Sequence, residues 1–371
     1  MYCKNISVCD FRNIEKAEVS FSEGVNILSG QNAQGKTNLL EAIFYPSVGR
    51  SFRGAHTPDM IRFGKVCAEI LLNFRDVKRD QSICVKIFRD RQRQIEKNGV
   101  RMDKLSDVVG SFRAVLFCPE HLCMIKDGPS ERRNYLDMAI SRMYPMYLHS
   151  LQQYHYILRQ RNALLKSAYT DRNAFNATIE FWSAQLAREA AIISDARLRY
   201  IRRASVYISE CFAEMTGEKE IPTIVYDGSS GQAEEEYQDR QMTEQKYFQL
   251  LMSSHDREIA VGSTLWGIHK DDLDIRLNGK SARIYGSQGQ QRSLALSMKL
   301  AEGEICKEEF KDYPVFLFDD VLSELDSVRQ EYLLHKIKGK QVIMTGCNPD
   351  LLSHVSDVHR IRVADGTYTE L

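Results

Sequence analysis

The sequence predicts an α/β fold with a mixed sheet and an inserted α-helical lobe. An apolar run at 25–28 is followed by a glycine-rich loop and a helical pattern, and a second apolar run at 315–318 ends in two carboxylates. Roughly 280 residues separate these two features, which is too long a connection for one compact α/β domain. Residues 144–215 supply the insertion, because apolar side chains recur there at spacings of three and four.

The composition is that of an ordinary globular protein, with 43% hydrophobic and 27% charged residues in a chain of 371. The sequence has no long apolar run, and its first residues alternate as in a strand instead of forming a signal peptide, so we expect a cytoplasmic protein without a membrane partner. Nine cysteines without a Cys-x-x-Cys pair predict reduced thiols and no Cys/His metal site.

The amino-terminal part is predicted to be mainly sheet. Five segments have the residue pattern of strands, at 6–14, 17–21, 25–28, 66–74 and 82–88. The first two would form a hairpin beside the third, and the last two would belong to an antiparallel sheet. A turn is expected at Asn98-Gly99.

From Pro129 onward the pattern becomes helical. Long amphipathic helices are expected at 144–169 and 174–215, and the polar, Gly- and Glu-rich segment 227–239 is expected to be a mobile connection. The predicted domains are an α/β domain made of 1–125 and 260–371, and a helical lobe with this polar connection at 126–259.

Sheet and helix patterns resume after the lobe. A strand at 274–277 precedes an Asn278-Gly279 turn, and a helix is expected at 288–307. Further strands are expected at 314–318 and 341–345, followed by carboxyl-terminal strands.

The glycine-rich loop is the strongest chemical signal. Residues 30–37, Gly-Gln-Asn-Ala-Gln-Gly-Lys-Thr, match the phosphate-binding pattern G-x-x-x-x-G-K-[ST] in its required setting between strand and helix. The glycines allow backbone N–H groups to turn toward phosphate oxygens, Lys36 would reach the β and γ phosphates, and Thr37 would offer its hydroxyl to Mg²⁺. The sequence therefore predicts a nucleotide site.

Two carboxylates supply the second element of this site. Asp319, at the end of a buried strand, is expected to hold Mg²⁺, and Asp320 is expected to orient the attacking water. Ser287-Gln288-Gly289-Gln290-Gln291, at a helix start, is a possible second anion-binding point, although such a motif alone is usually a helix cap.

Charge is unevenly distributed although fifty basic residues balance fifty acidic ones. Basic residues outnumber acidic ones in 75–104 and in 126–210, whereas acidic residues prevail in 214–258. A solvated face is the usual meaning of such runs, and DNA contact is the alternative.

Together these elements resemble the ATP-binding-cassette class of ATPase heads. Ser287 to Gln291 matches the signature motif, and Val321 to Asp326 matches the loop after the second carboxylate. Over nearly its whole length the chain is similar to the bacterial RecF family, whose heads are related to those of SMC and Rad50 proteins but lack their long coiled coils. The motifs that carry this similarity are Phe11-Arg12-Asn13, Gly30 to Asn38, Ser51-Phe52-Arg53-Gly54, Ile61-Arg62-Phe63-Gly64, Pro119-Glu120, Gly128 to Arg133, Tyr285 to Arg292 and Asp319 to Asp326.

The resemblance implies which residues meet ATP and Mg²⁺. The implied catalytic residues are Asp320, Lys36 and Ser287, and the implied metal ligands are Thr37 and Asp319. The implied ATP-binding residues are Gly30, Gln31, Asn32, Ala33, Gln34, Gly35, Lys36, Thr37, Asn38, Ser287, Gly289 and Gln290. In such heads the signature motif of one subunit closes over the γ-phosphate bound by another, so ATP would hold a head-to-tail homodimer together.

The resemblance also implies a function in recombinational repair, at the nucleoid. RecF-type proteins bind duplex DNA at single-strand gaps, help RecO and RecR to load RecA, and hydrolyse ATP weakly and in a DNA-dependent manner. The alternative kept open is another SMC- or Rad50-like head that acts as a DNA-clamping structural protein. A transporter-type cassette subunit and a cassette head fused to a nuclease fit less well, because the glutamine loop, glutamate base and switch histidine of the former and the extra acidic domain of the latter are not seen.

The chain departs from the usual cassette pattern at three places. Asp320 stands where a glutamate is usual, and Thr345 or Asn348 is proposed as the γ-phosphate sensor in place of a histidine. Glu120 lies where the coupling glutamine would be. Arg53 and Arg62 are candidates to reach the phosphates, with structural ion pairing as the more common role of such residues.

Overall fold

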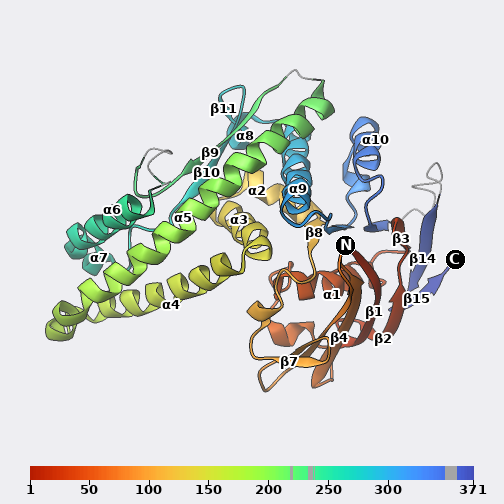
Figure 1. Ribbon diagram of the computed structural model, residues 1–371, viewed down its shortest axis with the longest axis horizontal. Helices are drawn as coiled ribbons and strands as arrows, with labels where there is room; N and C mark the ends of the chain where they lie inside the picture. Colours follow the sequence, from red (N-terminus) through yellow and green to blue (C-terminus); the bar gives the residue numbers. More distant parts are fainter. Residues whose placement is uncertain (218–219, 233–236, 238, 347–356) are drawn as a thin grey trace. The chain divides into compact units, whose positions relative to one another are not determined.

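The computed structural model of the chain describes residues 1–217, 220–232, 237, 239–346 and 357–371 (Figure 1). Packing divides the chain into two compact units. Unit 1 consists of Met1–Leu122, Glu214–Glu218 and Arg292–Leu371, and unit 2 of Cys123–Ala213 and Lys219–Gln291. The predicted domain division assigned residues 260–291 to the α/β part. Packing groups them with the helices, because the strand at Asp272–Leu277 pairs with that at Pro222–Asp227.

Unit 1 contains an antiparallel six-stranded sheet in the order β2-β1-β4-β5-β6-β7. Its strands are β1 (Tyr2–Phe11), β2 (Ile14–Ser20), β4 (Cys67–Arg75), β5 (Asp80–Phe88), β6 (Gln94–Lys97) and β7 (Val100–Met102). The predicted β1–β2 hairpin and the turn at Asn98-Gly99 are confirmed. Alternate side chains of β4 and β5 are buried, so one face of this sheet is in the core.

A second sheet in unit 1 has the order β15-β14-β3-β13-β12-β8. Its strands are β3 (Val25–Ser29), β8 (Ala114–Phe117), β12 (Val315–Phe318), β13 (Val342–Gly346), β14 (Val358–Ala364) and β15 (Thr367–Glu370). All neighbouring pairs are parallel except β14–β15, so the predicted mixed sheet is confirmed. Because parallel strands end at the same edge, the residues that follow β3 and β12 are brought to one side of the sheet.

Helix α1 (Lys36–Val48) packs against strands of both sheets and is buried along nearly its whole length. The apolar core of unit 1 therefore runs through both sheets and this helix. The remaining helical segments of the unit are η1 (Thr57–Met60), η2 (Leu105–Asp107), η3 (Pro119–Leu122), η5 (Leu322–Glu324), α10 (Ser327–Lys336) and most of α9 (Gln288–Phe310).

Unit 2 is the predicted helical lobe, with a small sheet in the order β11-β10-β9. Its elements are α2 (Cys123–Lys126), α3 (Pro129–Met143), α4 (Pro145–Ser167), α5 (Arg172–Thr216), β9 (Pro222–Asp227), α6 (Arg240–Ser253), α7 (His255–Val261), β10 (Asp272–Leu277), β11 (Lys280–Ser281) and α8 (Ala282–Tyr285). The two long helices predicted from periodicity are confirmed as α4 and α5. Pro145 begins α4, at a position where its missing N–H costs no helical hydrogen bond.

The expected mobile connection at 227–239 is packed in part. Ser230 and Tyr237 are buried, and their hydroxyl oxygens lie 2.5 Å apart. The buried ring of Tyr237 therefore anchors a segment whose polar composition predicts mobility.

None of the helices that the structure describes is both long enough and apolar enough to cross a membrane. The seven cysteines whose side chains are described are free thiols.

Candidate nucleotide site

The predicted phosphate loop joins β3 to α1, in the strand–loop–helix order that the pattern requires. Gly35 precedes the helix with φ +112°, and Ala33 is also left-handed with φ +65°. Left-handed residues within a loop turn neighbouring backbone N–H groups toward a common point and form an anion-binding concavity. A side chain at Gly30 would meet the carbonyl oxygen of Val363, because the Cβ would lie 2.2 Å from it. Glycine is therefore required there by close packing.

Lys36 lies over the beginning of the loop. Its Nζ donates hydrogen bonds to the carbonyl oxygens of Gly30 and Gln31, the latter at 3.0 Å, and the side chain is buried. The first turn of α1 contains no acidic residue that would offset the positive end of the helix. The ammonium group and the helix start thus form a positively charged position suited to phosphate.

Thr37 and Asp319, far apart in sequence, meet beside the loop. The Thr37 hydroxyl donates to Asp319 Oδ1 at 2.9 Å, and the Thr345 hydroxyl donates to the same oxygen at 2.8 Å. The two residues that were predicted to hold Mg²⁺ are therefore neighbours. A carboxylate and a hydroxyl are hard oxygen donors, which fit Mg²⁺ better than a thiophilic metal.

The Asp319 carboxyl is mostly buried, and burial raises its pKa. Hydrogen bonds from Thr345 and Thr37 act in the opposite direction, whereas the nearby carboxylates of Glu120 and Asp320 raise the pKa further. Only the ionised carboxylate coordinates a divalent cation, and the two hydroxyl donors favour that form of Asp319.

Asp320 follows β12 in a left-handed conformation, with φ +51°. Its backbone is held on both sides, since its N–H donates to Thr345 Oγ1 at 2.9 Å and its carbonyl oxygen accepts from Ser323 Oγ at 2.8 Å. The side chain is partly exposed at the end of the strand. This is a position from which a carboxylate can contact a water molecule.

The predicted signature motif lies in unit 2, at the start of α9. The Ser287 hydroxyl accepts a hydrogen bond from the Gln290 N–H at 3.2 Å, and Gln290 Oε1 accepts from the Ser287 N–H at 2.6 Å. This reciprocal pair is a capping box. The cap leaves Ser287 exposed and Gly289 partly exposed, and the preceding Ile284 and Tyr285 are each 70% exposed.

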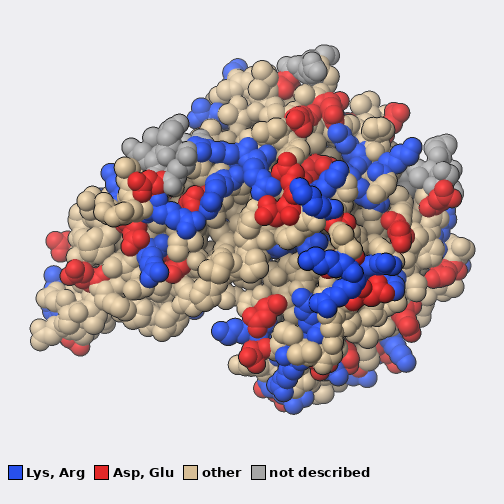
Figure 2. All heavy atoms as spheres, viewed as in Figure 1, with Lys and Arg blue, Asp and Glu red and all other residues tan. Residues whose placement is uncertain are grey.

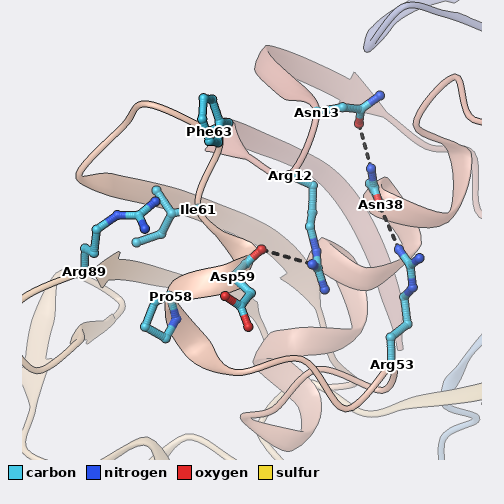
Figure 3. Close-up of a pocket in the computed structure, with 9 residues that line it drawn as sticks. All are labelled: Arg12, Asn13, Asn38, Arg53, Pro58, Asp59, Ile61, Phe63 and Arg89. Carbon is cyan, nitrogen blue, oxygen red and sulfur yellow. Dashed lines mark hydrogen bonds between the residues drawn. The ribbon is translucent and has the colours of Figure 1, made fainter.

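A pocket of about 450 Å³ opens beside the first turn of α1 (Figure 3). It is lined by Arg12, Asn13, Asn38, Arg53, Pro58, Asp59, Ile61, Phe63 and Arg89. Asn38 Nδ2 donates to Asn13 Oδ1 at 2.7 Å, and Arg53 donates to Asn38 Oδ1 at 3.1 Å. Phe63 is 98% exposed, which is exceptional for such a large apolar side chain.

A buried carboxylate lies behind this pocket, at a position that the sequence pattern does not predict. Glu41 of α1 is fully buried and accepts two hydrogen bonds from the Arg12 guanidinium, at 2.8 and 2.9 Å. The Ser51 hydroxyl also donates to Glu41, and the Arg53 N–H donates to Ser51 Oγ at 3.1 Å. The motifs Arg12-Asn13 and Ser51-Phe52-Arg53 contain the residues that surround Glu41, but only the three-dimensional structure shows that Glu41 connects them.

A family model described as the RecF/RecN/SMC N terminal domain matches residues 2–370. A curated protein of Clostridium novyi, "DNA replication and repair protein RecF", is 35% identical over 372 residues and covers all of both chains. The chain belongs to the RecF family. A second relative of the same name, from Bacillus pumilus, is 36% identical and covers 99% of each chain.

Solved structures of the RecF family have the same fold. The structure described as the recombination mediator protein RecF with ATPrS in the RecFOR pathway matches with a TM-score of 0.92 and 35% identity, over 100% of this chain and 98% of that one. The corresponding RecF–ATP structure matches with a TM-score of 0.90. An Smc head domain of Pyrococcus furiosus, 16% identical with a TM-score of 0.56, shares the fold alone. The predicted cassette-type ATPase head is thus confirmed.

The other predicted positions of this RecF-family chain differ in their surroundings. Glu120 lies in η3, directly after β8, and its charge raises the pKa of the buried Cys118 thiol, although less than burial does. Arg62 pairs with Glu15 at 2.8 Å. Asn348 lies outside the described residues, whereas Thr345, the other proposed sensor, contacts Asp319.

Proposed function

We propose that this chain is an ATP-controlled DNA-binding protein of recombinational repair, with weak, DNA-dependent ATP hydrolysis. The observation that carries the proposal is the hydrogen bond between Thr37 and Asp319, which joins a phosphate loop to a buried carboxylate 282 residues further along the chain. Membership of the RecF family supports the same reading, because relatives are described as replication and repair proteins and as ATP complexes.

The phosphates of ATP would lie on residues 30–37. Backbone N–H groups and Lys36 would neutralise the phosphate oxygens, and Thr37 and Asp319 would hold Mg²⁺. Bound Mg²⁺ would supply charge neutralisation at the phosphate oxygens. Asp320 would orient the water, and Thr345 would keep Asp319 in place.

The nucleoside end of ATP would enter the pocket beside α1. This pocket adjoins the loop, because Asn38 lies in the first turn of α1 and Asn13 is close to Gly35. Amide groups of Asn13 and Asn38 can pair with polar edges of a base or ribose, and the exposed ring of Phe63 can stack on a base.

A homodimer would complete the site. The exposed Ser287 and the neighbouring Gly289 would reach the γ-phosphate bound by a partner subunit, at the positive start of α9. The exposed apolar side chains of Ile284 and Tyr285 support an interface there, since such side chains are enriched where partners pack.

Duplex DNA at a single-strand gap is the proposed nucleic-acid ligand. Figure 2 shows basic side chains gathered along α5 on the face that it displays. Arg188, Arg199 and Arg202 are exposed on this helix, and their spacing of eleven and three residues places them on one side. Contacts of this kind go to backbone phosphates and weaken with salt.

The remaining assignments follow from this DNA role and from the family. We place the protein in the cytoplasm at the nucleoid, where DNA is found. RecR, together with RecO, would be its protein partner, with RecA loaded as the result. The pathway named for the ATP-bound relatives supports these partners.

Measurement of ATP binding by wild type, Lys36→Ala and Asp319→Asn tests the nucleotide site. We expect Lys36→Ala to lose affinity by roughly 100-fold, as expected when a buried charge-assisted contact to phosphate is lost. Asp319→Asn should bind ATP without Mg²⁺ normally but lose the increase in affinity that Mg²⁺ gives. Glu15→Gln, an exposed change in the same unit, serves as control. Equal affinity of all four proteins would refute the proposed site.

A further inference from the structure

The carboxyl-terminal hairpin β14–β15 contacts the phosphate loop directly. The Tyr368 hydroxyl donates a hydrogen bond to the Gly35 carbonyl oxygen at 3.0 Å. In the turn of the hairpin, the Gly366 N–H donates to the Gln34 carbonyl oxygen at 3.0 Å, and the Asp365 N–H donates to Gln34 Oε1 at 2.6 Å. Three donors from the end of the chain thus meet two consecutive loop residues.

These contacts help to determine which way the N–H groups of the loop point. In a planar trans peptide, the C=O of one residue and the N–H of the next point in opposite directions. Holding the Gln34 carbonyl toward the hairpin therefore turns the Gly35 N–H away from it. The Gly35 carbonyl accepts from the Tyr368 hydroxyl and also from the Leu39 N–H of α1 at 3.0 Å, so the hairpin and the helix together orient the peptide that carries the Lys36 N–H. The hairpin therefore helps to orient two adjacent N–H donors of the predicted phosphate cradle from behind the loop.

The hairpin is itself held firmly enough to orient another segment. β14 pairs with β3 along five residues, so the hairpin is part of the central sheet. A Cβ on Gly366, which has φ +74°, would lie 3.0 Å from the Asn13 carbonyl oxygen, so the turn is closely packed. Tyr368 also packs against the apolar core, and burial raises the pKa of its hydroxyl, which therefore remains protonated and able to donate.

We propose that the β14–β15 hairpin is a positioning element of the nucleotide site. Tyr368 and the Asp365–Gly366 turn hold the carbonyl groups of Gln34 and Gly35, so that the N–H groups of the following residues point toward the bound phosphate. Tyr368 is a positioning residue, since it acts through the loop backbone. The inference rests on the proposed function for its ligand, but its structural part, the restraint of the loop, is measurable without nucleotide.

The test compares Tyr368→Phe with Thr369→Ala in the full-length protein. Phenylalanine keeps the packed ring and removes only the hydroxyl, whereas Thr369 is the exposed next residue of the same strand. The first readout is amide hydrogen exchange of the peptide covering residues 30–36 in the nucleotide-free protein. The second is ATP affinity, and the third is the melting temperature without nucleotide.

We expect Tyr368→Phe to exchange faster than wild type at 30–36 and to bind ATP about three- to ten-fold more weakly, as for the loss of one hydrogen bond. Thr369→Ala should match wild type in both. Unchanged exchange and affinity in Tyr368→Phe would overturn the inference. A lower melting temperature with unchanged exchange and affinity would also overturn it, because the hydroxyl would then be merely structural. If wild type exchanged slowly but bound no ATP, the proposed function would fail, and the exchange data alone would decide the restraint of the loop.

Discussion

Glu41 illustrates how single residues shape the site. Its carboxylate is fully buried, and it is satisfied by the Arg12 guanidinium and the Ser51 hydroxyl. Arg12 in turn donates to the Asp59 carbonyl oxygen at 3.0 Å. The Glu41 carboxylate on α1 therefore connects three parts of the chain: the β1–β2 turn, the segment that follows α1, and η1. Each of them contributes residues to the lining of the pocket in Figure 3.

Glu41→Gln is expected to destabilise the protein by about 2–4 kcal/mol, because a neutral amide has one acceptor oxygen where the buried carboxylate has two, so one Arg12 donor would face an NH2 group. Denaturant unfolding, with the midpoint and slope both measured, gives this value. Glu15→Gln is the matched control, since Glu15 pairs with Arg62 at the surface and exposed pairs are worth about 0–1 kcal/mol. Similar losses for both variants would contradict a special role of the buried pair.

At the scale of elements, the last turn of α5 packs in unit 1 against α10. The Glu214 carboxylate accepts a hydrogen bond from the Tyr332 hydroxyl at 2.8 Å and forms an ion pair with Lys336 Nζ at 2.7 Å. α10 begins at the cap residue Asp326, the last residue of the loop that follows the second carboxylate. The end of the longest helix is therefore attached to the helix that follows this loop.

This attachment predicts a pH-dependent contribution to stability. Partial burial acts to raise the Glu214 pKa, but hydrogen bonds from Lys336 and Tyr332 outweigh it, so the pKa is lowered on folding. The contribution is therefore present above the unfolded-state pKa of about 4.3 and is lost as pH falls through the lower folded-state value. Glu214→Gln should reduce the free energy of unfolding by up to about 1 kcal/mol at pH 7.

Urea unfolding at pH 7 and at pH 3.5 measures the effect, which should shrink at the lower pH. Glu210→Gln, one turn earlier on the exposed side of α5, is the control and should have little effect at either pH. A loss of stability for Glu214→Gln that is the same at both pH values would show that charge is not its cause.

Local pattern was sufficient for most elements and for the loop. The strands around residues 6–28 and the helices α4 and α5 follow from side-chain periodicity, and the loop at 30–37 follows from a contiguous motif. The contact of the hairpin with that loop could not be predicted, because it is the parallel pairing of β14 with β3 that brings Tyr368 next to Gly35, and the sequence does not show this pairing. Glu41 was missed for a similar reason, since a glutamate within a helix gives no sign of being buried.

In the whole molecule, the proposed site is completed by a second copy of the chain. Ser287 lies at the start of α9 and is exposed, so it is accessible to a partner subunit. In the proposed mechanism the signature motif of one copy acts on ATP bound to another, so that ATP controls the assembly that binds DNA.

The most direct test of this claim is the sedimentation mass of Asp320→Asn with Mg²⁺-ATP, with and without a gapped DNA duplex, beside Lys36→Ala. Asp320→Asn is chosen because it should bind ATP but hydrolyse it more slowly. We expect ATP to double the mass of Asp320→Asn from the 42.7 kDa of one chain, the gapped duplex to sediment with the doubled species, and Lys36→Ala to stay monomeric. A monomeric mass of Asp320→Asn at saturating ATP, or dimers that form without nucleotide, would contradict the claim.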